Sequence, residues 1–203
     1  MHPLEYKEIE KILYKVNIKG KVLEVGALPK ELSLLNSKYL KSASEKIGLN
    51  LDGPFDCKDF KILKGNANNM KIFNDEYFDC VICNSVLEHD KYFWKSISEM
   101  KRVLKKGGVL ILGAPSYVER KLFKKKLLNK LVNGLLNKIT KIISRKNSVN
   151  FNNSTFCFKL HEYPGDFYRY SEQTFKEVFF EGFRDVEIET IMIPPRTYGF
   201  GYK

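Results

Sequence analysis

The sequence predicts an α/β fold in which a mostly parallel, doubly wound sheet is covered by helices. Two short apolar runs, Phe78–Cys83 and Val109–Leu112, lack helical periodicity, which is typical of strands buried on both faces. Between them, apolar residues recur every three or four positions from Lys91 to Leu104, and this pattern predicts an amphipathic helix. A strand, a helix and a strand with short joints form a right-handed βαβ unit of a parallel sheet.

The remaining elements follow in order along the chain. Apolar periodicity predicts an N-terminal helix over Leu4–Val16, which Gly20 ends, and a second helix over Glu31–Leu40. Ser171 and Thr174 mark the start of a last helix. The ten residues after the last expected strand contain glycine and proline, so a further antiparallel strand should be short or absent. The expected strands are 21–25, 47–51, 60–63, 78–83, 108–113 and 185–193.

The length of 203 residues favours a single domain over 1–203. Its first residues are polar and charged, unlike a signal peptide, and no apolar run is long enough to span a bilayer, so we expect a soluble cytoplasmic protein. Cys80 and Cys83 spell CxxC, but on a strand they face opposite sides, which argues against a shared metal or a disulfide. We therefore expect no metal site.

The net charge of +11 is concentrated in one segment. Residues 118–146 contain ten lysines or arginines and one glutamate, a net +9. Leucines and isoleucines follow a 3.6-residue period in the same segment. The sequence thus predicts a basic amphipathic helical insertion or lid within 118–160.

Two stretches carry a resemblance to a known family. FDCVICNSVLEH at 78–89 and EMKRVLKKGGVLILGAP at 99–115 resemble the fourth and fifth strands of class I S-adenosylmethionine-dependent methyltransferases, most closely the small proteins with an LEH motif. The resemblance runs from about 21 to 115, with a weaker match near 166–188. It implies a Rossmann-like sheet and S-adenosyl-L-methionine as the cofactor.

The resemblance also assigns the cofactor-binding residues. The glycine-rich loop after the first strand, GALPK, retains only Gly26, with Leu28 and Lys30 where later glycines usually stand. Carboxylates that the family uses for the ribose and the adenine correspond to amides here, which can still form hydrogen bonds. The implied cofactor contacts are Glu24, Gly26, Asn50, Asp52, Asn66, Ala67 and Asn84.

A general base is needed only when the methyl acceptor is a hydroxyl or an amine. Three residues are candidates for this catalytic role: His89 at the end of the fourth strand, and His161 and Asp166 in the loop HEYPGDFYRYS. Each has an alternative structural role in stabilising its loop. Tyr163, Tyr168 and Arg169 are candidates for binding a polar or anionic acceptor, or for packing that loop.

The sequence leaves several functions open. The first is a methyltransferase acting on a hydroxyl or amine of a small molecule, a glycan or a lipid-linked sugar. The alternative is a non-catalytic scaffold that has lost the cofactor. A dinucleotide enzyme is disfavoured because no GxGxxG follows the first strand. Segment 118–146 also fits peripheral contact with an anionic membrane, at the inner face; a nucleic-acid role is not expected, because aromatic residues are not interleaved there.

Overall fold

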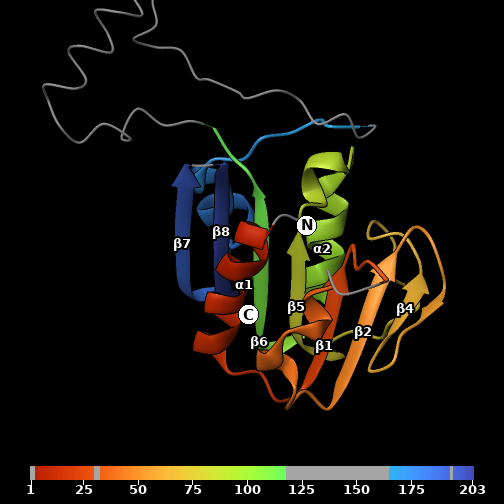
Figure 1. Cartoon of the computed structure of the whole chain (residues 1–203). Coiled ribbons are helices and arrows are strands. Elements are labelled where there is room, and N and C mark those ends of the chain that lie inside the picture. The colour runs from red at the N-terminus through yellow and green to blue at the C-terminus, as the bar shows by residue number, and fades with distance from the viewer. Residues whose placement is uncertain (1–2, 30–32, 118–164, 193) are drawn as a thin grey trace, which may run out of the picture.

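The computed structural model describes residues 3–29, 33–117, 165–192 and 194–203, and these residues form an eight-stranded sheet with helices on both faces (Figure 1). The order of the strands is β3-β4-β2-β1-β5-β6-β8-β7. The strands are β1 Lys21–Val25, β2 Glu45–Asn50, β3 Phe55–Asp56, β4 Lys61–Lys64, β5 Phe78–Asn84, β6 Leu104–Pro115, β7 Arg184–Met192 and β8 Pro195–Tyr202.

The middle of the sheet is parallel, as predicted. β1 pairs in parallel with β2 and β5, β2 with β4, and β5 with β6. β3, β7 and β8 join through antiparallel pairs. The α/β fold with a mostly parallel sheet is therefore confirmed, and β5 lies in its interior between β1 and β6. The carboxyl ends of the five parallel strands β4, β2, β1, β5 and β6 consequently meet along one edge of the sheet.

Two helices cover opposite faces of the sheet. α1 (Pro3–Val16) buries Ile9 and Leu13 in one hydrophobic cluster, and α2 (Phe93–Val103) buries Met100 in the other. Cys80 belongs to the first cluster and Cys83 to the second, so the expected opposition of the two thiols on the strand is confirmed. Burial raises the pKa of both thiols.

The prediction of an α-helix over 31–40 is wrong for the residues of that range that the structure describes. The chain forms two short 3-10 helices instead, η1 (Leu34–Asn36) and η2 (Lys38–Leu40). Ser33 and Ser37 each accept a hydrogen bond from the backbone two residues later, at Leu35 and Tyr39. These side-chain bonds favour short capped turns over a continuous α-helix.

The final antiparallel strand, expected to be short or absent, is present and complete. β8 runs for eight residues between β6 and β7. Its glycines do not break the strand, because there is no room for a side chain on that face: a Cβ on Gly199 would lie 2.9 Å from the ring of Phe180. Arg196, Tyr198 and Phe200 alternate with the glycines and are buried.

The last helical segment begins where predicted. The Ser171 hydroxyl accepts a hydrogen bond from the Thr174 backbone at 3.2 Å and caps α4 (Glu172–Thr174), which continues as the π-helix η6 (Phe175–Phe179). The insertion predicted within 118–160 lies outside the described residues. Among the residues that are described, no helix is long and apolar enough to cross a membrane.

Candidate functional site

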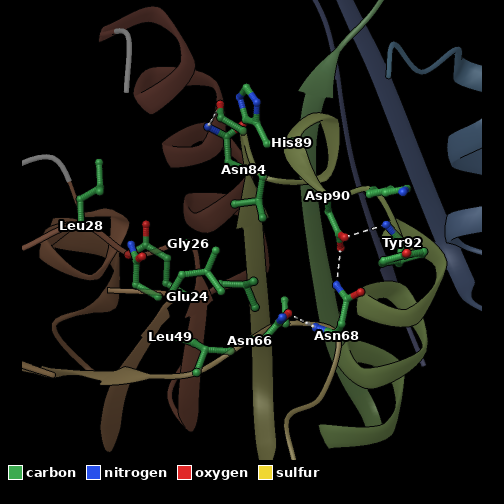
Figure 2. A pocket seen from close by; sticks show the side chains of 18 of the residues that line it. Glu24, Gly26, Leu28, Leu49, Asn66, Asn68, Asn84, His89, Asp90 and Tyr92 are labelled. Carbon is green, nitrogen blue, oxygen red and sulfur yellow. Dashed lines mark hydrogen bonds between the residues drawn. The ribbon is translucent and has the colours of Figure 1, made fainter. Parts of the chain in front are cut away.

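A cavity of about 500 Å³ opens at the carboxyl ends of β1, β2, β4 and β5 (Figure 2). Its volume lies within the range of about 300–1,000 Å³ that is usual for small-molecule sites. The LEH motif forms the 3-10 helix η3 (Leu87–His89) directly after β5 and contributes to the wall. The lining residues are Glu24, Val25, Gly26, Leu28, Leu49, Asn50, Leu51, Gly65, Asn66, Ala67, Asn68, Asn84, Ser85, Val86, His89, Asp90, Lys91, Tyr92 and Phe167.

Gly26 directly follows β1 and has a backbone conformation that favours glycine. Its φ is +80°, and a Cβ there would lie 2.3 Å from Val86 Cγ2. The backbone N–H groups of Gly26 and Ala27 both donate to the Leu49 carbonyl, so the loop is fastened to β2. Leu28 forms part of the cavity wall and is 43% exposed. The loop thus keeps a close backbone approach at one glycine and adds an apolar side chain.

Glu24 lines the cavity but is already held by the chain itself. Its carboxylate accepts hydrogen bonds from the Ser33 hydroxyl and from the backbone of Leu34 and Leu35. Burial raises the pKa of Glu24 to about 7, although these hydrogen bonds oppose the shift. Glu24 therefore anchors η1 at the edge of the cavity.

Asn50 lines the cavity at the end of β2. Its amide nitrogen donates to the Ala27 carbonyl at 2.7 Å, and its amide oxygen accepts from the Asp52 backbone at 3.1 Å. One N–H and one lone pair of the amide remain for a ligand. Asp52 is exposed and is not part of the cavity wall.

The loop after β4 contributes Asn66, Ala67 and Asn68. Asn66 accepts a hydrogen bond from the Asn68 backbone at 2.8 Å, which leaves its second lone pair. The Asn68 amide donates to Asp90 at 2.7 Å (Figure 2). Asp90 also accepts a hydrogen bond from the Ser96 hydroxyl at 2.6 Å. This network, which the sequence analysis missed, ties the β4 loop to the segment after the LEH motif. Nothing in the sequence marks Asp90 as its centre.

Asn84 and His89 lie at the other end of the cavity from Asn66 and Asn68 (Figure 2). Ser85 between them has a positive φ of +57°, which is uncommon for a residue other than glycine. The fully buried Glu88 has one carboxylate oxygen 4.0 Å from His89 Nε2. The structure thus brings one predicted base, His89, to the cavity beside the predicted contact Asn84.

Of the other predicted catalytic and acceptor-binding residues, those that the structure describes lie outside the cavity wall. Asp166 and Arg169 pair with each other at 2.7 Å with side chains 5% and 10% exposed. The Tyr168 hydroxyl donates to the Lys91 carbonyl, and its ring packs edge-on against Phe93. His161 and Tyr163 lie outside the described residues. From this loop, the described residue that does line the cavity is Phe167, which the sequence analysis did not single out.

The part of the chain that the structure describes contains no group of three or more His, Cys, Asp or Glu side chains that is arranged to hold a metal ion.

Comparison with known proteins finds similarity over part of the chain. A methyltransferase domain model matches residues 31–112, a range that includes the loops after β2, β4 and β5. The curated protein MJ1123 of Methanocaldococcus jannaschii is 31% identical over 114 residues, which are 50% of this chain and 52% of that protein. The chain thus spans about half the length of this curated relative.

Solved structures show the same fold at low identity. An S-adenosylmethionine-dependent methyltransferase from Archaeoglobus fulgidus is 14% identical, with a TM-score of 0.59 over 98% of this chain and 93% of that one. Phosphoethanolamine N-methyltransferase 2 of Haemonchus contortus, crystallised with S-adenosyl-L-methionine, is 12% identical, with a TM-score of 0.61 over 99% of this chain and 52% of that one.

Proposed function

We propose that this chain is a class I S-adenosylmethionine-dependent methyltransferase, which binds S-adenosyl-L-methionine in the cavity at the carboxyl ends of the strands and transfers its methyl group; the methyltransferase domain model over 31–112 and the shared fold support this. The observation that carries the proposal is Gly26. Its positive φ and its lack of a Cβ keep the loop after β1 close to Val86, so the cavity has a backbone wall where the family's cofactor approaches most closely.

The residues present fit this cofactor. Asn50 and Asn66 each retain hydrogen-bonding capacity for the ribose hydroxyls and the adenine, and Leu49, Leu51 and Ala67 supply apolar walls for a base. Asp52, which is exposed outside the wall, is the weaker candidate for the ribose. Gly26 and Asn84 would hold the amino-acid end, and Glu24 would act mainly by fixing the nearby loop.

The cofactor would supply an electrophilic methyl group on a sulfonium. The chain's residues would align an acceptor with it and exclude water, and such alignment can be worth about 7–11 kcal/mol of the barrier. We propose His89 as the group that takes the acceptor's proton, since it lines the cavity beside Asn84. Asp166 is the weaker candidate, because its carboxylate pairs with Arg169. The acceptor that we propose carries a hydroxyl or an amine and is a small molecule, a glycan or a lipid-linked sugar.

Calorimetric titration with S-adenosyl-L-methionine and S-adenosylhomocysteine tests the binding step. We expect one site with micromolar to sub-millimolar affinity. Ala67→Trp should abolish this binding, because it would place an indole ring in the cavity. A matched control, Ile72→Trp, changes an exposed apolar residue outside the cavity wall and should bind normally. Absence of binding by the wild type at millimolar ligand would instead support the alternative, a scaffold that has lost the cofactor.

The alternative rests on a specific feature of the cavity. Leu28 contributes a large apolar side chain to the wall at a position where the family usually has glycine. If this side chain blocks the cofactor, Leu28→Gly should create binding that the wild type lacks. Equal binding by the two proteins would show that Leu28 only forms part of the wall.

The proposed base has its own test. With the true acceptor, His89→Ala should lower turnover by about a hundredfold or more, since general-base catalysis contributes roughly that much. His161→Ala is the parallel variant, because His161 is the remaining histidine candidate. Wild-type turnover in both variants would exclude a histidine base.

A further inference from the structure

A buried charge cluster backs the end of the cavity where Asn84 and Ser85 lie. Its centre is Arg196 of β8, which is 3% exposed and is not part of the cavity wall. The guanidinium lies 3.3 Å from a Glu5 carboxylate oxygen of α1 and 3.6 Å from one of Glu88 in η3. The same group donates to the Ser85 hydroxyl at 2.6 Å. One side chain thus contacts a helix, the end of β5 and the LEH motif.

The Ser85 hydroxyl is fully used within the protein. It accepts hydrogen bonds from Arg196 and from the Asn84 amide at 3.1 Å, and it donates to Glu5 at 3.0 Å. A hydroxyl has one donor and two acceptor lone pairs, so none is left for a ligand. Ser85 therefore shapes the cavity wall through its position.

The backbone conformation of Ser85 is one that needs support from its surroundings. Ser85 has φ +57°, a conformation that residues other than glycine keep only when their surroundings hold them there. The backbone N–H of Ser85 donates to the Gly113 carbonyl, and the Arg196 guanidinium donates to its side-chain hydroxyl. The next residues, Val86 and His89, line the cavity, so the path of the chain through them depends on this point.

We propose that Arg196 is a positioning residue for the amino-acid end of the cofactor: through Ser85 and Glu88 it holds the stretch from Asn84 to His89 in the conformation that forms this end of the cavity. The inference rests on the proposed function. Asn50 and Asn66, at the nucleoside end, have no contact with the Arg196 cluster among the described hydrogen bonds and ion pairs. Arg196 should therefore affect recognition of the amino-acid part and leave recognition of the nucleoside part unchanged.

Two ligands distinguish binding at the amino-acid end of the cavity from binding at the nucleoside end. S-adenosylhomocysteine carries the amino-acid part, whereas 5′-methylthioadenosine has the same nucleoside and sulfur without it. By calorimetry, Arg196→Met should weaken S-adenosylhomocysteine binding at least about tenfold and change methylthioadenosine binding by less than about twofold. The control Lys105→Met removes an ion pair with Asp79 outside the cavity wall and should change neither ligand. Equal losses for both ligands in Arg196→Met, or no loss, would overturn the role of Arg196.

A second pair of variants keeps the inference testable if Arg196→Met does not fold. Ser85→Ala removes the hydroxyl but leaves a Cβ at positive φ, so the stretch should relax and S-adenosylhomocysteine binding should fall about tenfold. Ser85→Gly also removes the hydroxyl, but glycine adopts positive φ without support, so its loss should be several-fold smaller. Equal losses in the two variants would mean that the hydroxyl itself binds the ligand, and would overturn the inference. If the wild type binds neither ligand, the cofactor assignment itself is overturned, and the inference about Arg196 is overturned with it.

Discussion

Gly26 occupies the point where β1 ends and the cavity begins. Its φ of +80° is shared with Gly182, but a Cβ on Gly182 would meet nothing within 4 Å, whereas one on Gly26 would collide with Val86. An alanine at Gly182 would therefore cause backbone strain alone, whereas an alanine at Gly26 would cause the same strain and a steric collision. A left-handed conformation costs an L-residue about 1–2 kcal/mol.

We predict that Gly182→Ala lowers the free energy of unfolding by about that amount and leaves cofactor binding unchanged. Gly26→Ala should destabilise the protein further and abolish binding, because Val86 or the loop must move. Denaturant unfolding and calorimetry measure the two effects. Equal behaviour of the two variants would show that the Gly26 loop has room to relax.

Glu88 of η3 is a fully buried carboxyl group whose pKa is shifted by its environment. Burial raises its pKa from 4.5 to about 7, although Arg196 opposes the shift. The folded protein therefore holds this proton more tightly than the unfolded chain does. The resulting stabilisation is complete below about pH 4.5 and is lost as the pH rises through about 7.

We predict that wild-type stability falls between pH 5 and pH 8, and that Glu88→Gln reduces this fall. One pKa unit corresponds to about 1.4 kcal/mol, so the part that disappears should be on the order of 3 kcal/mol. Glu24, whose pKa is also raised to about 7, still titrates in both proteins and leaves a residual slope. Urea unfolding at several pH values gives the two profiles, and parallel profiles would refute the assignment to Glu88.

At the scale of elements, β8 depends on glycine for its place in the sheet. Gly199 faces the ring of Phe180, which is buried, and the Glu187 carbonyl lies 3.1 Å from the position of a Cβ. We predict that Gly199→Ala costs about 1–3 kcal/mol of stability through overpacking. Adding Phe180→Leu should recover part of that loss, since it removes the ring that the new methyl group meets. A double variant less stable than both single variants added together would contradict this packing.

The contrast between β5 and β8 explains what the sequence could predict. Local apolar runs and periodicity placed β5 and α2 correctly, because burial on a sheet face leaves a direct pattern in the sequence. The glycines of β8 resembled breaks because their reason, the ring of Phe180, comes from a distant segment. The 3-10 turns at Leu34–Leu40 were missed for a related reason, since the Ser33 and Ser37 caps outweighed the leucine spacing.

The candidate site likewise contains residues that the sequence could indicate and a residue that it could not. The cavity is lined by residues that end parallel strands or follow them directly, among them Gly26, Asn50, Asn66, Ala67 and Asn84. Their contact with the cofactor, which the family resemblance implies, stays a prediction. Arg196 could not be predicted, because its contacts to Glu5 and Ser85 arise only when β8 is inserted beside β6.

For the whole molecule, the basic segment 118–146 gives a prediction that rests on sequence alone. Each basic residue near an anionic membrane contributes about 1 kcal/mol, so several of the ten would hold the protein weakly at such a surface. We predict sedimentation with anionic vesicles that weakens with salt and falls when Leu128, Leu135 and Ile139 are changed to Ser. Equal recovery in the supernatant with and without anionic vesicles at low salt would exclude membrane contact.

The claim that the cofactor occupies the cavity at the carboxyl ends of the strands can be checked residue by residue with nuclear magnetic resonance. On addition of S-adenosylhomocysteine, the backbone amide signals of 24–28, 49–51, 65–68 and 84–90 should shift together and saturate with one affinity. The signals of 104–108, at the opposite end of β6, should stay in place. Shifts confined to other parts of the chain, or no shifts at millimolar ligand, would contradict the claim.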